Sequence, residues 1–285
     1  MSCVIAGTVP YENFPLADAE AILTREELRF GGHTIPVARG TAALAATCSL
    51  AATALGIRQP RIIVAGDIGR GNGSTEIYRY LVERLSDIPA DVLVFHYFQP
   101  DVDWHNRILI KIEELAERPL LVADAGYMYV AKMSGFSKSY DLFTPDAGEM
   151  AFLADESAPH PFYTRGFLLK EEERIPELIR RAYENDNAPH YLLVKGRKDV
   201  VASRKGIISE IANPCVENME PIGGTGDSLT GVVAALLAAG RTVPDAAKRG
   251  AEINRLMGLF ANPSPASSVG ELLPYLPRAM TANDP

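Results

Sequence analysis

The chain has 285 residues, of which 47% are hydrophobic and 22% are charged, a composition that excludes collagen-like, disordered and small disulfide-rich proteins. Its 28 basic and 36 acidic side chains give a formal net charge of −8, which argues against nucleic acid or an anionic membrane as the main partner. A small anion can still bind, because backbone N–H groups at a helix start hold anions whatever the net charge.

The cysteines and the N-terminus favour a cytoplasmic protein. Cys3, Cys48 and Cys215 are odd in number, widely spaced and form no CxxC pair, so we expect reduced thiols rather than disulfides or a zinc site. The N-terminus lacks the basic region of a signal peptide. The uncharged stretch 41–57 is too short and too weakly apolar to span a membrane, and we predict a buried helix there.

Short apolar runs alternate with segments of helical periodicity, which predicts βαβ units, a mostly parallel sheet and helices on both of its faces. No linker or repeat interrupts this alternation, so we expect one domain over 1–285, with a Pro- and Ser-rich tail, 262–285, that wraps the surface. The predicted strands are 4–10, 61–66, 91–95, 120–124, 140–143, 191–195 and a hairpin of 200–202 with 207–208; the predicted helices are 41–57, 74–85, 107–116, 146–153, 171–183, 226–239 and 244–260, with a Pro-rich loop around 159–161.

A glycine-rich loop, 67–74, lies between a predicted strand and a predicted helix. It resembles the dinucleotide-binding fingerprint and the loop of S-adenosylmethionine methyltransferases, but Ser74 replaces the third glycine. The next strand also lacks the acidic residue that both patterns require at its end. Two interpretations stay open, namely a tight structural turn and a substrate cleft lined by Asp67 and Asn72.

A second glycine-rich loop, Gly223-Gly224-Thr225-Gly226, precedes a strongly apolar helical segment. Its backbone N–H groups and the positive end of the helix dipole predict an anion-binding site. Asp227 follows in the first turn of the same helix. It suits a general base that takes a proton from a hydroxyl group attacking a bound phosphoryl group, or alternatively a simple helix N-cap.

This loop carries the resemblance to a known family. GGTGDSLTG at 223–231 resembles the signature of the ribokinase-like superfamily, and it is most similar to the GGTGD-x-LTG of NAD(P)H-hydrate dehydratases. VADA at 122–125, FTPDAGE at 143–149 and LVKG at 193–196 resemble the DADA, TPHPGE and LKG elements of that branch in the same order. The resemblance covers about residues 120–260 and implies a three-layer α/β/α sandwich with a mostly parallel central sheet.

The N-terminal part departs from the dehydratase pattern. Gly40-Thr41-Ala42 stands where dehydratases have a GAP helix start, but about 30 residues intervene after the first predicted strand. The segment 215–221 also lacks the usual G-N-x-x-M-A. Since the N-terminal half supplies most substrate contacts in this superfamily, these departures affect the substrate more than the phosphoryl chemistry.

The resemblance implies a role for individual residues. Structural alternatives remain open for Glu149 as a solvated helix residue, Lys195 as a strand end and Asp124 as a cap. The implied roles are Asp227 as catalytic base; Gly223, Gly224, Thr225 and Gly226 as phosphate-binding anion hole; Lys195, Gly196 and Asn254 as nucleotide-binding residues; Glu149 as Mg²⁺ ligand through water; and Asp124, with Asp67 and Asn72, as the substrate cleft.

The implied activity is phosphoryl transfer with ATP or ADP and Mg²⁺. The combination of TPxxGE and GGTGDxLTG favours an NAD(P)H-hydrate dehydratase, a lyase that phosphorylates the hydroxyl group of the hydrate and then eliminates phosphate. The altered N-terminal half favours a transferase, a kinase for a sugar or vitamin alcohol. A non-catalytic nucleotide sensor is a third hypothesis. Homo-oligomers are common in the resembled family, so the expected partners are a small-molecule substrate, a nucleotide and further copies of the chain.

The five histidines show no HxH or HxxxH spacing, so we expect no zinc site. His96 directly follows a predicted strand, where ligand contacts are expected in open α/β sheets. We nevertheless interpret it as a packed histidine. The sequence also contains no GxxxxGK[ST], which excludes a P-loop.

Overall fold

The structure is a computed structural model that describes residues 1–25, 27–155 and 174–282. Its main sheet has the order β12-β11-β10-β9-β8-β7-β1-β6-β2. The six strands from β10 to β6 pair in parallel, whereas β12, β11 and β2 pair antiparallel with their neighbours. The strands are β1 (Cys3–Val9), β2 (Ala17–Glu20), β6 (Arg61–Gly66), β7 (Val92–His96), β8 (Leu120–Asp124), β9 (Leu142–Phe143), β10 (Tyr191–Val194), β11 (Asp199–Ser203) and β12 (Gly206–Ile211).

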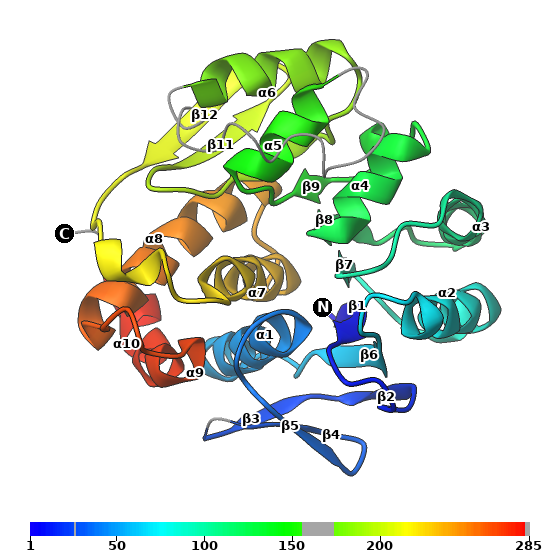
Figure 1. The fold of residues 1–285 in the computed structure, drawn as a ribbon, viewed down its shortest axis with the longest axis horizontal. Helices are drawn as coiled ribbons and strands as arrows, with labels where there is room; N and C mark the ends of the chain where they lie inside the picture. Colours follow the sequence, from blue (N-terminus) through cyan, green and yellow to red (C-terminus); the bar gives the residue numbers. More distant parts are fainter. Residues whose placement is uncertain (26, 156–173, 283–285) are drawn as a thin grey trace.

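Helices cover both faces of this sheet, which confirms the predicted three-layer α/β/α sandwich with a mostly parallel sheet (Figure 1). One core lies between the sheet and α1, α7 and α8, and a second lies between the sheet and α2 to α6. The helices are α1 (Thr41–Leu55), α2 (Asn72–Arg84), α3 (Val102–Glu113), α4 (Gly126–Met133), α5 (Ala147–Ala154), α6 (Ile175–Glu184), α7 (Thr225–Ala238), α8 (Val243–Ala261), α9 (Val269–Leu272) and α10 (Leu276–Thr281).

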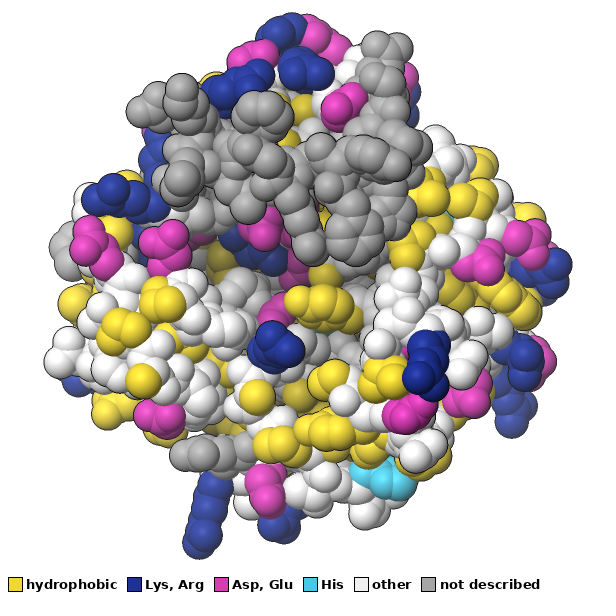
Figure 2. Space-filling model, viewed as in Figure 1, with side chains coloured by type: hydrophobic (Ala, Val, Ile, Leu, Met, Phe, Trp, Pro, Cys, Tyr) yellow, Lys and Arg dark blue, Asp and Glu magenta, His cyan; other side chains and the backbone are white. Residues whose placement is uncertain are grey.

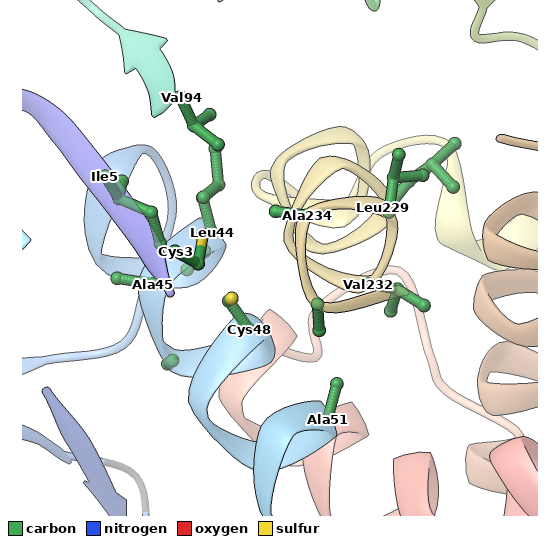
Figure 3. Packing of buried hydrophobic residues seen from close by; sticks show 14 of the residues in the cluster. Cys3, Ile5, Leu44, Ala45, Cys48, Ala51, Val94, Leu229, Val232 and Ala234 are labelled. Carbon is green, nitrogen blue, oxygen red and sulfur yellow. The ribbon is translucent and has the colours of Figure 1, made fainter. Parts of the chain in front are cut away.

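Helices α1 and α7 pack unusually close together because their facing residues are small. A Cβ atom placed on Gly231 of α7 would lie 2.4 Å from the carbonyl oxygen of Leu44 in α1. Cys48, Ala51 and Ala234 also lie in this core, with the inward side chains of β1 and β7 above them (Figure 3). This close packing brings the first residues of α1 next to the first turn of α7.

The strand register brings three chemically important positions to one edge of the sheet. Gly7 pairs with His96, and His96 in turn pairs with Asp124, so the carboxyl ends of β1, β7 and β8 lie side by side. A Cβ atom on Gly7 would lie 2.3 Å from the carbonyl oxygen of His96, so only glycine fits there. In open α/β sheets this edge is where ligands bind.

The residues that separate the first strand from α1 contain a small sheet that the sequence analysis missed. Its strands are β3 (Ile22–Thr24), β4 (Glu27–Phe30) and β5 (His33–Pro36), in the order β3-β4-β5. Leu28, Phe30 and Ile35 are buried at alternate positions. Strands of three or four residues give too short an alternation to identify from sequence. Helix α4 was missed as well.

The C-terminal tail, which was predicted to wrap the surface, contains the short helices α9 and α10 and several buried apolar side chains. Helices α9 and α10 and the 3-10 turn Leu273–Tyr275 between them insert apolar side chains into the core beside α1 and α8. Apolar residues of this segment therefore shield α1 and α8 from solvent. Its buried residues are Val269, Leu272, Leu273, Leu276 and Ala279.

Two further predictions concern the segment around residues 159–171 and the possibility of a membrane-spanning helix. The Pro-rich loop around 159–161 and the first residues of the helix predicted from 171 lie outside the described residues. Among the described helices, none combines the length and the apolar composition that crossing a bilayer requires.

Candidate active site

The second glycine loop forms a compact turn at the N-terminus of α7. Gly224 takes the N-cap position with φ of 96°, a left-handed conformation that favours glycine. The hydroxyl group of Thr225 donates to the carbonyl oxygen of Ile222 at 3.1 Å, which fixes the turn. The N–H groups of the first helical turn lack partners within their own helix, so this end of α7 suits an anion.

The loop before α1 forms one wall of this turn. The Cβ position of Gly224 lies 3.0 Å from the Cα atom of Arg39 and 3.1 Å from the carbonyl oxygen of Ala38. A methylene group of Arg39 lies 3.6 Å from the Cβ position of Gly223. Arg39 is exposed, so the structure adds a cationic residue to the rim of the turn that the sequence analysis did not identify.

Asp227 points away from its own helix and into the site. Its Oδ2 accepts a hydrogen bond from the N–H of Gly40 at 2.6 Å, and its Oδ1 lies 3.0 Å from Nε2 of His96. Because Gly224 is the N-cap and no side chain caps α7, the interpretation of Asp227 as a mere N-cap is wrong.

Asp227 is a carboxylate suited to accept a proton. Burial alone would raise its pKa, but the hydrogen bond and charge of His96, the charge of Lys195 and the N–H of Gly40 together lower it. Its side chain is only 13% exposed, so water competes little for the proton. Asp227 is therefore ionised at neutral pH, which is the form that a general base requires.

His96 belongs to the site, and its interpretation as a packed histidine is incomplete. It is fully buried, yet both ring nitrogens have polar partners, because Nδ1 lies 3.0 Å from Oγ1 of Thr41 while Nε2 faces Asp227. The signal that could have identified it is its position directly after a strand of the parallel sheet.

Asp124 and Lys195 form a buried ion pair beside the anion-binding turn. Nζ of Lys195 donates to Oδ1 of Asp124 at 2.8 Å, and the hydroxyl group of Thr230 donates to Oδ2 at 2.7 Å. Burial alone would lower the pKa of Lys195, but the charges of Asp124 and Glu149 raise it, so the ammonium group keeps its proton. Nζ lies 3.6 Å from the Cβ position of Gly226, so its charge stands next to the predicted phosphate site.

His96, Asp124 and Asp227 offer three potential metal-ligating atoms within 4.8 Å of one another. Their carboxylate oxygens already have partners, however. Oδ1 of Asp124 accepts from Lys195 and from the N–H of Ala125, and its Oδ2 accepts from Thr230. Since both oxygens of Asp227 are engaged as well, we interpret the group as a hydrogen-bond network. Acidic and basic side chains also lie close together in the middle of the face that Figure 2 shows.

Glu149 lies in the first turn of α5 and forms a capping box with Asp146. Its Oε2 accepts from the N–H of Asp146 at 2.8 Å, so part of its role is structural. Burial and the charge of Asp146 raise its pKa to about 8, against the effect of Lys195. This crowding of carboxylates fits a hard divalent cation such as Mg²⁺, which takes carboxylate oxygens and water as ligands.

The residues predicted to bind the nucleotide mainly contact the protein itself. Asn254 accepts from Ser228 at 2.7 Å and donates to the carbonyl oxygen of Thr225 at 3.2 Å, so it supports the start of α7. The N–H of Gly196 donates to Asp199, which forms a buried ion pair with Arg255 at 2.7 Å. The sequence analysis missed this ion pair. Nucleotide contacts by Gly196 and Asn254 stay predictions.

The first glycine loop has a structural organisation of its own. Oδ1 of Asp67 accepts from the N–H groups of Gly69, Arg70 and Gly71 at 2.9–3.0 Å, and Oδ2 accepts from Ser74. These bonds agree with the interpretation as a tight turn. Asn72 is the exposed first residue of α2. A role of Asp67 and Asn72 in a substrate cleft stays a prediction.

Tyr97 is a further residue at the site that the sequence analysis did not single out. Its backbone φ of 56° is unusual for a large side chain, and such strain often occurs at functional sites. Its ring lies 4.4 Å from that of His96 in an edge-on arrangement, and it is 49% exposed. Partial burial and the charges of Asp227, Asp124 and Glu149 raise the pKa of Tyr97 to about 12. The site therefore has an aromatic surface next to its candidate base.

Comparison with protein families identifies one match. The sequence model of a carbohydrate kinase family, described as NAD(P)H-hydrate dehydratase, matches residues 100–276. An uncharacterized protein of Methanocaldococcus jannaschii is 39% identical over 221 residues, which are 77% of this chain and 90% of that protein. A bifunctional NAD(P)H-hydrate repair enzyme of Thermofilum pendens is 26% identical over 251 residues, and the match spans 80% of this chain but only 42% of that enzyme.

Solved structures resemble the fold. The pyridoxal kinase of Staphylococcus aureus, solved with AMP-PCP and pyridoxal, superimposes with a TM-score of 0.54 at 11% sequence identity. The match covers 90% of this chain and 88% of that kinase. At this identity the likeness concerns the fold, which is that of ribokinase-like kinases.

Proposed function

This chain belongs to the NAD(P)H-hydrate dehydratase family of ribokinase-like enzymes, and we propose that it transfers a phosphoryl group from ATP or ADP to a hydroxyl group of a small molecule. The observation that carries the proposal is the position of Asp227. This mostly buried, ionised carboxylate lies in the helical turn that offers N–H groups to an anion.

The surrounding charges suit this reaction. The ammonium group of Lys195 lies at the anion-binding turn, where it would balance charge on a phosphoryl group during transfer. Because these groups are held by the fold before any ligand binds, they need no rearrangement during the reaction.

In the proposed step, a hydroxyl group of the substrate attacks the terminal phosphoryl group of the nucleotide. The hydroxyl oxygen of the substrate forms a bond to the terminal phosphorus atom of the nucleotide, and the hydroxyl proton passes to Asp227. The bond between that phosphorus atom and the bridging oxygen breaks, and its electron pair leaves with the nucleotide. Glu149 and Asp146 would hold Mg²⁺, which supplies positive charge to the phosphates when bound. Lys195, Gly196 and the turn 223–226 would face the phosphates of the nucleotide.

Two outcomes follow from the same machinery. If the phosphorylated carbon lies next to a position that can lose a proton, phosphate leaves and the net reaction is a dehydration. The family match and the similarity to the NAD(P)H-hydrate repair enzyme favour this outcome. A kinase that releases a stable phosphate ester is the second candidate. It is favoured by the sheet β3-β4-β5 and by a family match that begins only at residue 100.

A paired assay tests the proposal. Purified protein is incubated with Mg²⁺ and either ATP or ADP, once with hydrated NADH and once with a panel of sugars and vitamin alcohols. Recovery of NADH absorbance with release of phosphate supports the dehydratase, whereas a stable phosphorylated product supports the kinase. Nucleotide binding without turnover in both assays would contradict an enzymatic role and support the sensor hypothesis.

Asp227→Asn tests the mechanism. Since removal of a general base typically lowers turnover by about 10²- to 10⁴-fold, we expect a loss of that size with nucleotide affinity nearly unchanged. Asp245→Asn is the matched control, because Asp245 also lies in the first turn of a helix but is exposed and remote from the site. Full activity of Asp227→Asn would contradict the proposal, as would an equal loss in both variants.

A further inference from the structure

The position of one proton at the site follows from a chain of hydrogen bonds that starts at Thr41. Its Oγ1 lies 2.8 Å from the carbonyl oxygen of Thr8, which can only accept, so the single hydroxyl proton of Thr41 is donated to Thr8. The other partner of Oγ1 is Nδ1 of His96 at 3.0 Å. Since Thr41 has no second proton to donate, Nδ1 of His96 must carry a proton and donate it.

The other nitrogen of the ring faces a carboxylate. Nε2 of His96 lies 3.0 Å from Oδ1 of Asp227, and in a neutral ring with a protonated Nδ1 it would present a lone pair to that oxygen. Two lone pairs at this distance repel each other, and the repulsion is weakly screened because the ring is fully buried. A proton must therefore lie between Nε2 and Oδ1.

We propose that His96 is a positioning residue of this site, an imidazolium that donates to Thr41 through Nδ1 and to Asp227 through Nε2. In this form it fixes the direction of the Asp227 carboxylate together with the N–H of Gly40, which donates to the other oxygen at 2.6 Å. Because the His96 ring is fully buried and both of its nitrogens face protein atoms, we assign it no direct contact with a ligand. It acts through the base.

The charged and titratable groups around the ring are compatible with an imidazolium. From β8, Oδ2 of Asp124 lies 3.9 Å from Nε2, and Asp124 is itself paired with Lys195 of the segment after β10. From α7, Asp227 faces the ring directly, and the phenol ring of Tyr97 lies edge-on against it. Of the two carboxylates that face the ring, Asp124 is paired with Lys195, so the imidazolium is the cationic partner of Asp227; Glu149 acts on the same site through Lys195 and Tyr97.

The consequence for catalysis rests on the proposed function. The hydroxyl proton of the substrate moves to Asp227 while His96 keeps its own proton, and Asp227 returns its proton to solvent after the product leaves. Activity then requires the form with one proton on the pair. A further proton on Asp227 removes the base, and loss of the proton between the two residues removes the alignment, so turnover falls at both ends of the pH range.

The proton itself is tested without any activity measurement. Nuclear magnetic resonance of the whole protein labelled with ¹⁵N-histidine at neutral pH should give two protonated ring nitrogens for His96, assigned by the signal missing in His96→Gln. In Asp227→Asn, the amide can donate to a bare Nε2, so we expect the neutral ring protonated at Nδ1 only. A bare Nε2 in the unmodified protein would overturn the proposal.

The pH dependence of turnover tests the positioning role. Glutamine places an amide N–H near the position of Nε2 but carries no charge and does not titrate. In His96→Gln, the acid limb should therefore move up by about 1 to 3 pH units, because the cation that lowers the pKa of Asp227 is gone. The alkaline limb should disappear. A uniform loss of turnover with both limbs unmoved would show a merely structural role and reject the proposal.

Thr41→Val is a second variant in case His96→Gln does not fold. Valine has the shape of threonine without its oxygen, so Nδ1 loses the acceptor that fixes its proton. The neutral ring can then place its proton on Nε2 and continue to donate to Asp227, so activity should extend to higher pH, while Thr41→Ser should behave like the unmodified protein. Suppose that the ¹⁵N spectra show a bare Nε2 and that Thr41→Val has the same pH profile as the unsubstituted protein, while Asp227→Asn still lowers turnover strongly. The His96 proposal is then rejected, and the proposed function stands.

Discussion

At the scale of single residues, Glu149 illustrates how one carboxylate can serve both the fold and a ligand. It closes a capping box at the start of α5, yet burial and the nearby Asp146 raise its pKa to about 8. The folded protein therefore holds a proton on Glu149 at pH values where the unfolded chain has lost it. A cation that binds the ionised carboxylate of Glu149 should therefore stabilise the folded protein.

The direction of the pH effect follows from this shift. The pKa of Glu149 rises from an ordinary value of 4.5 to about 8 in the folded state, so the protein loses stability as pH rises through this range and does not regain it above. We expect Glu149→Gln to flatten this decline in thermal unfolding curves. Added Mg²⁺ at about pH 8 should stabilise the unmodified protein and leave the variant nearly unchanged.

The chain offers a matched control for this substitution. Glu271 occupies the same capping-box position in α9, but its pKa is lowered by its bonds to Ser268 and it lies at the surface. Glu271→Gln should therefore leave the response to Mg²⁺ intact. Equal Mg²⁺ responses in the unmodified protein and in Glu149→Gln would remove Glu149 from the metal site.

At the scale of elements, the two ends of α7 differ in what surrounds them. Gly224 and Gly240 both have left-handed backbones, with φ of 96° and 88°. A Cβ atom on Gly224 would lie 2.9 Å from Val269 and 3.0 Å from the backbone of Arg39, whereas on Gly240 it would meet only Met1 at 3.9 Å. The N-terminal end is thus enclosed by parts of the chain far apart in sequence.

This difference predicts unequal costs for the same substitution. Gly240→Ala should lower the free energy of unfolding by about 1–2 kcal/mol, the cost of a left-handed alanine. Gly224→Ala should cost about 2–5 kcal/mol, because about 1–3 kcal/mol of overpacking is added. It should also weaken phosphate binding, since the turn must shift. Denaturant unfolding of both variants measures the difference, and equal costs would contradict the enclosure of this turn.

At the scale of the whole molecule, the C-terminal segment stabilises the layer that carries the site. Helix α10 packs against α1 and α8, and Val269 at the start of α9 contacts the turn before α7. Leu276 is fully buried, whereas Leu259 on α8 is 49% exposed. Substitution of these two leucines therefore distinguishes the loss of a core contact from the loss of a surface side chain.

Leu276→Ala should lower the free energy of unfolding by about 2–5 kcal/mol, because it leaves a cavity in the core beside α1 and α8. Leu259→Ala should change it by less than about 0.5 kcal/mol, as is usual at the surface. Chemical denaturation followed by circular dichroism provides both values. If the two variants unfold alike, the C-terminal segment does not belong to the cooperative core.

The predicted elements differ in how well they agree with the structure. The strands predicted at 61–66 and 120–124 match β6 and β8 at both ends. Both are buried strands bounded by clear breaks, and burial on both faces produces a continuous apolar run that is easy to recognise. Strands β3 to β5 were missed, because short strands with one exposed face carry little periodic signal.

The amino-acid sequence was enough to predict the fold class, the succession of the main strands and helices along the chain, and the glycine turn with Asp227 in the helical turn that follows. These features depend on local patterns of apolar residues and glycines, which can be recognised within one short segment of the sequence. The hydrogen-bond partners of Asp227, in contrast, became known from the three-dimensional structure. Gly40 and His96 lie 187 and 131 positions away from it in sequence. His96 lies beside Asp227 because the strand register brings the carboxyl end of β7 to this edge of the sheet. Gly40 lies there because small residues let α1 pack closely against α7. Neither contact can be inferred from a single segment of the chain.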